Sequence, residues 1–281
     1  MKALLTLCTL LLCCTCLHAA EHPFIKIQGS NNGQGFFSIF TGIMGLLDKY
    51  DKGEYSGFSV NFARDGLYYD ENWGPNWWNY YFMPLHRGAN PATPPTPTHL
   101  SCNFAVYCIN HLSKQRCNVL IKKYIRLRPH IEDKMNQFVK HHFQNYFMVG
   151  VHYRGTDKMN YEAPILEYEL IINSINQYIY NNPDKEIRIF LATDEEDFFE
   201  EMMQRFPDKV VTASTIRSKD GEAIHFKKDN KYKHGEEALL DCLLLSRCNY
   251  LIRTSSNLSL CSTFFNPHLT VELLNPGKFD R

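Results

Sequence analysis

The chain has 281 residues, of which 44% are hydrophobic, and it carries 30 basic and 30 acidic side chains. This length and apolar content suffice for one large domain or for two smaller ones. Because the charges balance, the chain has no overall attraction to nucleic acid or to an anionic membrane, and any anion must bind at a local site.

The first twenty residues predict a secretory signal peptide. Lys2 precedes an apolar run rich in Leu and Cys, which ends at Ala19 and Ala20. The run is short for a membrane span, although an uncleaved signal anchor is an open alternative. We therefore expect a protein that is exported or enters the secretory pathway, with no other membrane attachment.

The cysteine content permits disulfides in an exported protein. An even number of cysteines remains after the signal peptide. Pairing of Cys102 or Cys108 with Cys117 would staple a loop, whereas buried free thiols are an equal alternative for the later cysteines. No spacing typical of a zinc site is present. The six cysteines are Cys102, Cys108, Cys117, Cys242, Cys248 and Cys261.

Residues 21–140 predict an amino-terminal Rossmann-like domain. A strand at 24–27, a glycine-rich loop at 29–35 and a helix from Phe36 follow one another, and a second strand is expected at 57–62. The loop lacks the G-x-G-x-x-G pattern of dinucleotide-binding folds. The loop is either a tight turn or the start of a helix whose N-terminus binds an anion.

Three further stretches complete this first part. Trp73, Trp77 and Trp78 could stack on sugar rings, although aromatic residues this dense more often form a core. Residues 90–99 are rich in Pro and Thr, which predicts a surface loop or linker. Residues 111–147 show helical patterning.

Residues 141–281 alternate between strand and helix patterns, which predicts a parallel sheet covered on both faces. The whole chain is therefore expected to have an α/β fold. The expected strands are 147–151, 187–192, 209–212, 250–253 and 269–274, and the expected helices are 164–180, 195–206, 235–246 and 254–264, the last capped by polar residues.

Polar residues follow three of these strands where each one ends. Because the carboxyl ends of parallel strands meet at one edge of a sheet, we expect these side chains to form one binding site. Each also has a structural alternative: a packed histidine, an Arg–Asp ion pair or a helix cap. The residues are His152, Arg154, Asp194, Thr254, Ser255 and Ser256.

The chemistry of this cluster favours an anionic ligand. Arg154 and Lys158 are cationic donors suited to a diphosphate, and Glu162 is a candidate general base. No P-loop and no tight Asp-x-Asp pair is present, so we expect Arg and Lys rather than a metal ion to supply the positive charge.

The segment HYRGTDK at 152–158, with Glu162 four residues on, resembles the His-x-Arg-x-Thr-Asp-Lys motif of the α1,6-fucosyltransferases and of the related nodulation and protein O-fucosyltransferases. Residues 190–194 and 239–259 resemble the second and third motifs of these enzymes, in the same order. The chain departs from the α1,6-enzymes at Gly155, where they carry a second arginine.

This resemblance implies a GT-B architecture of two Rossmann-like parallel-sheet domains, in which the carboxyl-terminal domain, residues 141–281, holds the donor. It implies inverting, metal-independent transfer of a sugar from a GDP-sugar, GDP-fucose above all, to a glycan or protein acceptor. No cofactor is implied.

Residue roles carry over from the resemblance only at matching positions. Glu162 would deprotonate the acceptor hydroxyl, Arg154 would neutralise the diphosphate, and Lys158 would support the leaving group or orient the acceptor. The remaining matched residues would bind the donor: His152 beside the diphosphate, Asp194 at the nucleoside, and Ser255 or Ser256 at a phosphate.

A function of another class is an alternative. An exported carbohydrate-binding or host-interaction protein could keep this fold without turnover, and it would bind sugars through the three tryptophans independently of Glu162.

The single N-glycosylation sequon, Asn257-Leu258-Ser259, lies in the expected phosphate-binding loop, so we predict that it is unmodified.

Overall fold

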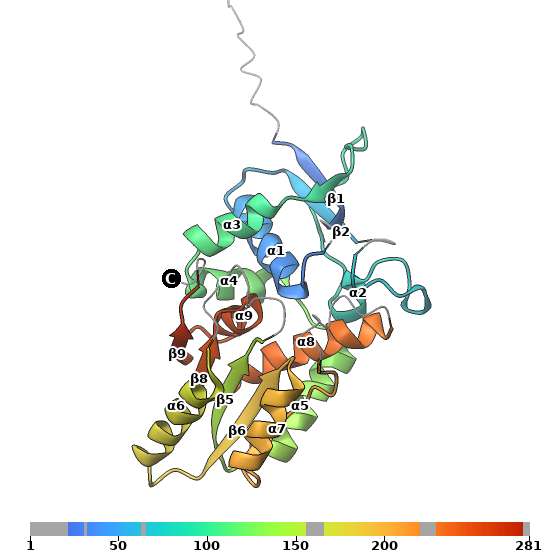
Figure 1. Ribbon diagram of the computed structural model, residues 1–281. Helices are drawn as coiled ribbons and strands as arrows, with labels where there is room; N and C mark the ends of the chain where they lie inside the picture. Colours follow the sequence, from blue (N-terminus) through green and yellow to red (C-terminus); the bar gives the residue numbers. More distant parts are fainter. Residues whose placement is uncertain (1–21, 31–32, 63–65, 156–165, 220–228, 278–281) are drawn as a thin grey trace, which may run out of the picture.

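The computed structural model of the protein describes residues 22–30, 33–62, 66–155, 166–219 and 229–277. Two sheets lie one above the other, and helices cover them and pack between them (Figure 1). The expected signal peptide lies outside the described residues. Within them, no helix has the length and apolar character needed to cross a membrane.

The amino-terminal sheet is mainly parallel. Its central strand β1 pairs in parallel with β2 and β4, and β3 adds an antiparallel edge strand. Strand β4 overlaps the Pro-rich loop expected at 90–99. Its backbone is extended because it pairs with β1, and the local composition gives no sign of this pairing. The strands are β1 (Phe24–Ser30), β2 (Gly57–Asn61), β3 (His86–Arg87) and β4 (Thr98–Leu100), and helix α1 (Phe36–Asp51) connects β1 to β2.

The carboxyl-terminal sheet is entirely parallel, in the order β7-β6-β5-β8-β9, as the alternating pattern predicts. Helices α6 and α7 contribute to the core on one face, and α8 and α9 contribute to the core on the other. The strands are β5 (Phe147–Tyr153), β6 (Ile187–Thr193), β7 (Val210–Val211), β8 (Tyr250–Thr254) and β9 (Thr270–Asn275), and the helices are α6 (Tyr168–Tyr180), α7 (Glu196–Arg205), α8 (Lys231–Leu245) and α9 (Asn257–Phe265).

The helical region between the sheets is divided into three helices, α3 (Cys102–His111), α4 (Lys114–Tyr124) and α5 (Pro129–His142). The hydroxyls of Ser101 and Ser113 accept hydrogen bonds from the first turns of α3 and α4 and so begin these helices. A single-turn 3-10 helix, η1 (Glu71–Trp73), and the short helix α2 (Trp78–Tyr81) precede this region.

One hydrophobic core extends across both sheets. The Phe40 ring of α1 stacks on Phe265 at the end of α9, with 5.7 Å between centroids, and Phe138 of α5 packs edge-on against Phe190 of β6. A domain boundary at residues 140 and 141 stays a prediction.

The tryptophans have two different environments. Trp77 and Trp78 are each 1% exposed and belong to the core, whereas Trp73 is 51% exposed. The core packing that is more frequent for such dense aromatic residues is therefore confirmed for Trp77 and Trp78, and the sugar-stacking alternative does not apply to these two rings.

The cysteines of the described residues are free thiols, so the disulfide expected from the sequence is not formed in the structure. Cys108 and Cys117 are nevertheless buried together, with their Sγ atoms 3.9 Å apart. These two thiols pack as small apolar side chains between α3 and α4.

Candidate active site

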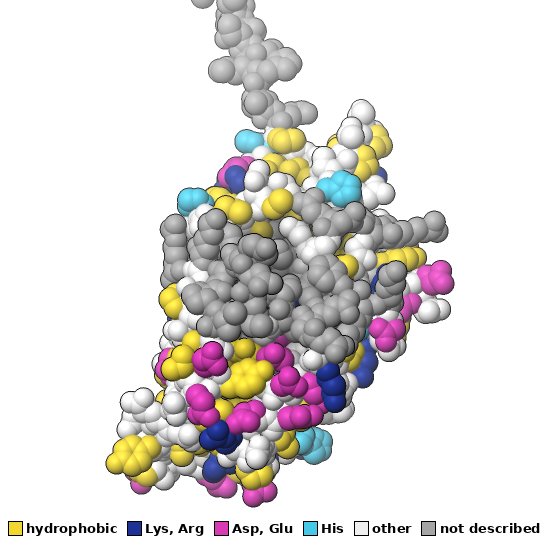
Figure 2. Space-filling model, viewed as in Figure 1, with side chains coloured by type: hydrophobic (Ala, Val, Ile, Leu, Met, Phe, Trp, Pro, Cys, Tyr) yellow, Lys and Arg dark blue, Asp and Glu magenta, His cyan; other side chains and the backbone are white. Residues whose placement is uncertain are grey.

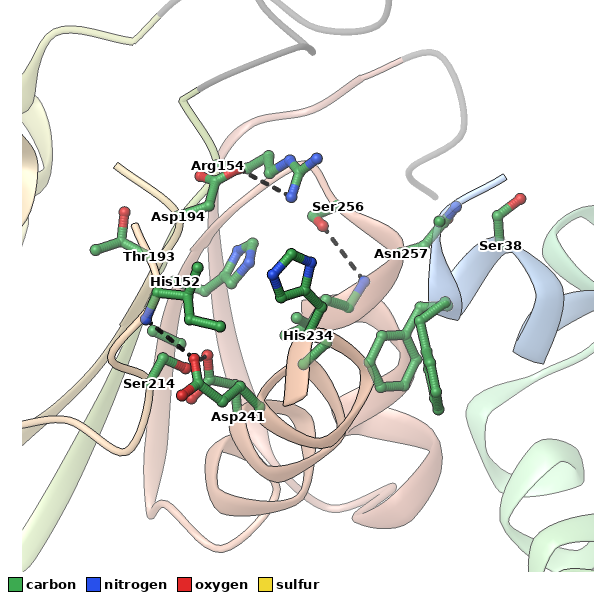
Figure 3. A pocket seen from close by; sticks show the side chains of 18 of the residues that line it. Ser38, His152, Arg154, Thr193, Asp194, Ser214, His234, Asp241, Ser256 and Asn257 are labelled. Atoms are coloured by element: carbon green, nitrogen blue, oxygen red, sulfur yellow. Dashed lines mark hydrogen bonds and ion pairs between the residues drawn. The ribbon is translucent and has the colours of Figure 1, made fainter. Parts of the chain in front are cut away.

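A pocket of about 420 Å³ lies at the carboxyl edge of the second sheet. Its walls come from the ends of β5 and β6, from α8, from the start of α9 and from the loop that leads into α1. In Figure 3, Arg154 and Asp194 lie at one end of the pocket, Ser214 and Asp241 lie at the other, and the rings of His152 and His234 lie between them. The pocket thus collects the strand ends that the sequence brings to one edge.

Arg154 is held in place at the cationic end. Its Nη1 lies 2.9 Å from Asp194 Oδ2, and its backbone N–H donates to Thr254 Oγ1 over 3.0 Å. The N–H of Gly155 donates to the other Asp194 oxygen, Oδ1, over 3.2 Å. Asp157, the partner of Arg154 in the structural alternative of an Arg–Asp ion pair, lies outside the described residues. Asp194 therefore positions Arg154, and its expected contact with a nucleoside stays a prediction.

The start of α9 supplies further hydrogen-bond donors to the pocket. Ser256 caps the helix by accepting from Leu258 N over 3.3 Å, and Ser256 and Asn257 both line the pocket. Thr254 and Ser255 are buried but are not among the lining residues. Of the three expected hydroxyl residues, only Ser256 reaches the pocket wall, and it is also a helix cap.

The glycine-rich loop forms another wall of the pocket. Its tight turn is confirmed, whereas anion binding at the helix that follows stays a prediction. Gly33 has a φ of 86°, as a tight turn requires, and Gly35 precedes α1 without a side-chain cap. The Phe36 N–H donates to the hydroxyl of Tyr68, which also lines the pocket. The N-terminus of α1 therefore opens toward the pocket, where backbone N–H groups suit an anion.

The other end of the pocket carries a buried acid that the sequence analysis missed. Asp241 Oδ2 accepts a hydrogen bond from Ser214, while no described residue hydrogen-bonds to Oδ1. Burial raises the pKa of Asp241 to about 7, and nearby Glu237 adds to this shift, whereas the Ser214 hydrogen bond opposes it.

A sequence signal for this part of the pocket did exist. His234, Glu237 and Asp241 recur at helical spacing along α8, whose second half is otherwise apolar, and all three line the pocket. A polar stripe on a buried helix is unusual, because buried polar groups are costly unless they find partners. It points to a face that contacts a ligand.

Gly155 has a steric reason to be glycine. A Cβ atom at this position would overlap the carboxylate of Glu195 and would lie 2.8 Å from the Tyr153 ring. Burial raises the pKa of Glu195, which accepts a hydrogen bond from Tyr168. In this chain a carboxylate thus occupies the space next to the position where the resembled motif has its second arginine.

Lys158 and Glu162 lie outside the described residues. The structure therefore does not place them relative to the pocket. Their roles as leaving-group support and general base stay predictions.

Comparisons with known proteins agree with this fold. The chain matches the family described as "Alpha-(1,6)-fucosyltransferase N- and catalytic domains" over residues 116–264, which is more than half of its length. It is 25% identical over 181 residues to nodulation protein Z of Bradyrhizobium diazoefficiens, a match that covers 61% of this chain and 49% of that protein. The chain therefore spans about half the length of this curated relative.

Two solved structures resemble the whole fold. The fucosyltransferase NodZ from Bradyrhizobium aligns with a TM-score of 0.55 at 16% identity, covering 89% of this chain and 94% of that one. NodZ α-1,6-fucosyltransferase soaked with GDP-fucose aligns with a TM-score of 0.56 at 16% identity, covering 88% and 94%. These matches establish the two-sheet GT-B fold expected from the sequence. On the match over residues 116–264, the chain belongs to the α-(1,6)-fucosyltransferase family.

Proposed function

We propose that this protein transfers fucose from GDP-fucose to a glycan or protein acceptor, with inversion at the anomeric carbon and without a metal ion. Membership of the family and the likeness to a structure soaked with GDP-fucose support the donor. The observation that carries the proposal is the polarity of the pocket. It has a fixed cation and the N-terminus of α9 at one end and a buried acid at the other.

The cationic end suits the diphosphate of the donor. Arg154 offers guanidinium N–H groups, and the start of α9 offers backbone N–H groups beside Ser256. Such donors bind phosphate oxygens well and are held before the ligand arrives. This arrangement needs no metal ion to balance the phosphate charge.

The buried acid suits the guanine base. Asp241 Oδ1 has no hydrogen-bond partner among the described residues, so it can accept from N–H groups of a ligand. The guanine edge offers an N1–H and an amino group side by side, whereas adenine has an acceptor at N1. Leaving a buried acceptor unpaired is costly, so Asp241 would favour guanine.

The transfer step needs a base and a stabilised leaving group. Glu162 removes the proton of the acceptor hydroxyl as its oxygen attacks the anomeric carbon, and GDP leaves from the opposite face. Arg154 and the N–H groups of α9 stabilise the negative charge that develops on the diphosphate, with Lys158 in support.

We further propose that the protein works in the secretory pathway, to which the predicted signal peptide would direct it.

The first test is a binding titration with GDP, UDP and ADP, without metal and then with Mg²⁺. We expect selective GDP binding that does not need Mg²⁺. Arg154→Ala should weaken it by about 10- to 100-fold, the effect of losing hydrogen bonds to a charged group. Arg247→Ala is the matched control, since Arg247 is exposed and outside the pocket. Absence of GDP binding in folded protein would contradict the proposal.

The second test separates turnover from binding. With GDP-fucose and an acceptor mixture, Glu162→Gln should abolish transfer and leave GDP binding intact. The same change at the exposed Glu167 should affect neither. Nucleotide-independent sugar binding without transfer would instead favour the exported binding protein.

A further inference from the structure

Trp73 is an exposed aromatic ring that the fold does not need to bury. It is 51% exposed, whereas the other tryptophans lie in the core. It belongs to η1, and neither Trp73 nor its contact on α8, Tyr232, lines the donor pocket. The ring therefore belongs to a separate part of the surface.

One face of the Trp73 ring is fixed by stacking. It lies parallel to the Tyr232 ring, with 3.6 Å between centroids and an interplanar angle of 3°. Tyr232 is itself held, because its hydroxyl donates to Glu236 over 2.7 Å and lies 3.0 Å from His130 Nε2, and its carbonyl accepts from Tyr81. The plane of Trp73 is thus set by a rigid support.

The turn that carries Trp73 is also held at both ends. The Tyr80 hydroxyl lies 2.7 Å from the carbonyl oxygen of Asp70 and 2.5 Å from that of Gly74. The Asp70 side chain accepts from the backbone and the side chain of Asn72, each over 3.0 Å. The orientation of the exposed ring is therefore established before any ligand arrives, which lowers the entropic cost of binding.

We propose that the free face of Trp73 is a stacking platform for a neutral pyranose ring, at a saccharide site separate from the donor pocket. A flat aromatic face packs against the C–H groups of a sugar ring with equatorial substituents. The exposed side chains of Glu71 and Asn72 lie beside Trp73 in the chain and can hydrogen-bond to sugar hydroxyls. The acidic side chains of Asp70 and Glu71 disfavour an anionic sugar.

The site can be tested through the tryptophan itself. Because Trp73 is the exposed member of the three tryptophans, a sugar on its face should change its emission and protect it from acrylamide. The probes are neutral β-1,4-linked tetrasaccharides of glucose and of N-acetylglucosamine, with tetragalacturonate as the anionic comparison. Calorimetry measures the same titrations in variants that lack Trp73.

We expect at least one neutral tetrasaccharide to bind and tetragalacturonate not to bind. Trp73→Ala should weaken binding by about tenfold, the scale of an aromatic stacking contact. Trp73→Phe, which keeps a flat ring over Tyr232, should lose much less. Tyr180→Ala is the control, because Tyr180 is 84% exposed on another helix and is not part of the platform.

The proposal is overturned if no neutral probe binds, or if Trp73→Ala binds as the wild type does. Should Trp73→Ala fail to fold, Tyr80→Phe is the second variant. It removes the hydroxyl contacts that hold the turn but keeps the Trp73 side chain, so weaker sugar binding is expected in this variant as well. The site does not depend on the nucleotide. GDP titrations of the same samples report separately on the donor pocket, and either site can fail alone.

Discussion

At the scale of single residues, Asp241 gives the pocket a pH response. Its pKa of about 7 lies above the ordinary value of 3.8, so the carboxyl is mostly neutral at pH 6 and mostly charged at pH 8. Only the charged form offers two acceptor oxygens to a base. We predict that GDP affinity rises between pH 6 and pH 8, measured by calorimetry, and that Asp241→Asn binds weakly at both pH values. A similar rise in Asp241→Asn would contradict this role.

The same group links pH to stability. The pKa of Asp241 is higher in the folded state than its ordinary value of 3.8. Its neutral form therefore stabilises the folded state, fully so below pH 3.8, and this stabilisation is lost as the pH rises through about 7. Relative to Asp241→Asn, the free energy of unfolding of the wild type should therefore fall between pH 4 and pH 7. The exposed Asp208→Asn should follow the wild type.

Gly155 and Glu195 should behave as a coupled pair. A methyl group at 155 meets the Glu195 carboxylate, so Gly155→Ala should lower the free energy of unfolding by about 1–3 kcal/mol, as overpacking does. Adding Glu195→Ala should recover part of this loss in urea unfolding. Gly35→Ala, where a Cβ meets nothing within 4 Å and φ is −67°, is the control and should be nearly neutral. Additive effects at 155 and 195 would exclude the coupling.

Sequence reasoning found the residues that follow strands and missed those on a helix. His152, Arg154 and Asp194 were predictable, because a buried strand fixes where its end lies. Thr254 and Ser255 follow a strand too, yet they do not line the pocket. Local sequence alone does not determine which way successive residues point once the strand gives way to a turn.

At the scale of elements, a buried acid joins three helices of the amino-terminal part. Asp48 of α1 is fully buried and accepts from Arg116 of α4, Tyr107 of α3 and Lys52, each over 2.7 Å. Burial alone would raise the pKa of Asp48, but these hydrogen bonds outweigh it and lower the pKa below its ordinary value.

We predict that Asp48→Asn costs about 2 kcal/mol of stability, since it weakens the charged hydrogen bonds from Arg116, Lys52 and Tyr107, although Arg116 keeps its second partner, Asp51. Because the pKa of Asp48 is lowered, its contribution is present above pH 3.8 and is lost as pH falls through the folded pKa. The difference between wild type and variant in urea unfolding should therefore shrink in acid. Asp133→Asn, an exposed change on α5, serves as the control. A constant difference from pH 7 to pH 3 would argue against this ion pair.

Elements with strong local patterns were predictable, and those that depend on distant pairing were not. Strands β5, β6 and β8 are apolar runs with buried faces on both sides, and each appeared close to its predicted place. Strand β4 has three residues in a Pro-rich stretch and exists because β1 lies beside it. The division of 111–147 into helices depends on local breaks within one helical pattern: Ser113 caps α4, and Pro129 begins α5.

At the scale of the whole molecule, the shared core predicts one cooperative unfolding transition. Residues of both sheets and of the helices between them belong to one hydrophobic cluster. Heating should therefore give the same midpoint by tryptophan emission, which reports on the first part of the chain, and by far-ultraviolet circular dichroism. At 100 times its dissociation constant, GDP should stabilise both signals by about 2.7 kcal/mol. Two separate midpoints would show that the halves unfold independently.

The relation between the halves was beyond sequence reasoning. The motifs between residues 152 and 259 indicated the family and the donor-binding half, because they lie together at strand ends. The contacts of α1 with α9 and of α5 with β6 come from packing between distant segments.

The distribution of charge on the surface is a feature that composition does not show. The face in Figure 2 carries many acidic side chains below its centre, although the chain has equal numbers of acidic and basic residues.

The side chain of Asn118 reaches across this shared core to the far end of α9. Its Nδ2 donates to the carbonyl oxygens of Phe264 and Phe265 over 2.8 and 3.0 Å. Aligned peptide dipoles give a helix a partial negative charge at its last carbonyls and a partial positive charge at its first N–H groups. In a helix of nine residues the two charges lie close enough for one to weaken the field of the other. By donating to the last carbonyls, an amide on α4 offsets part of the negative charge at one end of a helix whose other end lines the pocket.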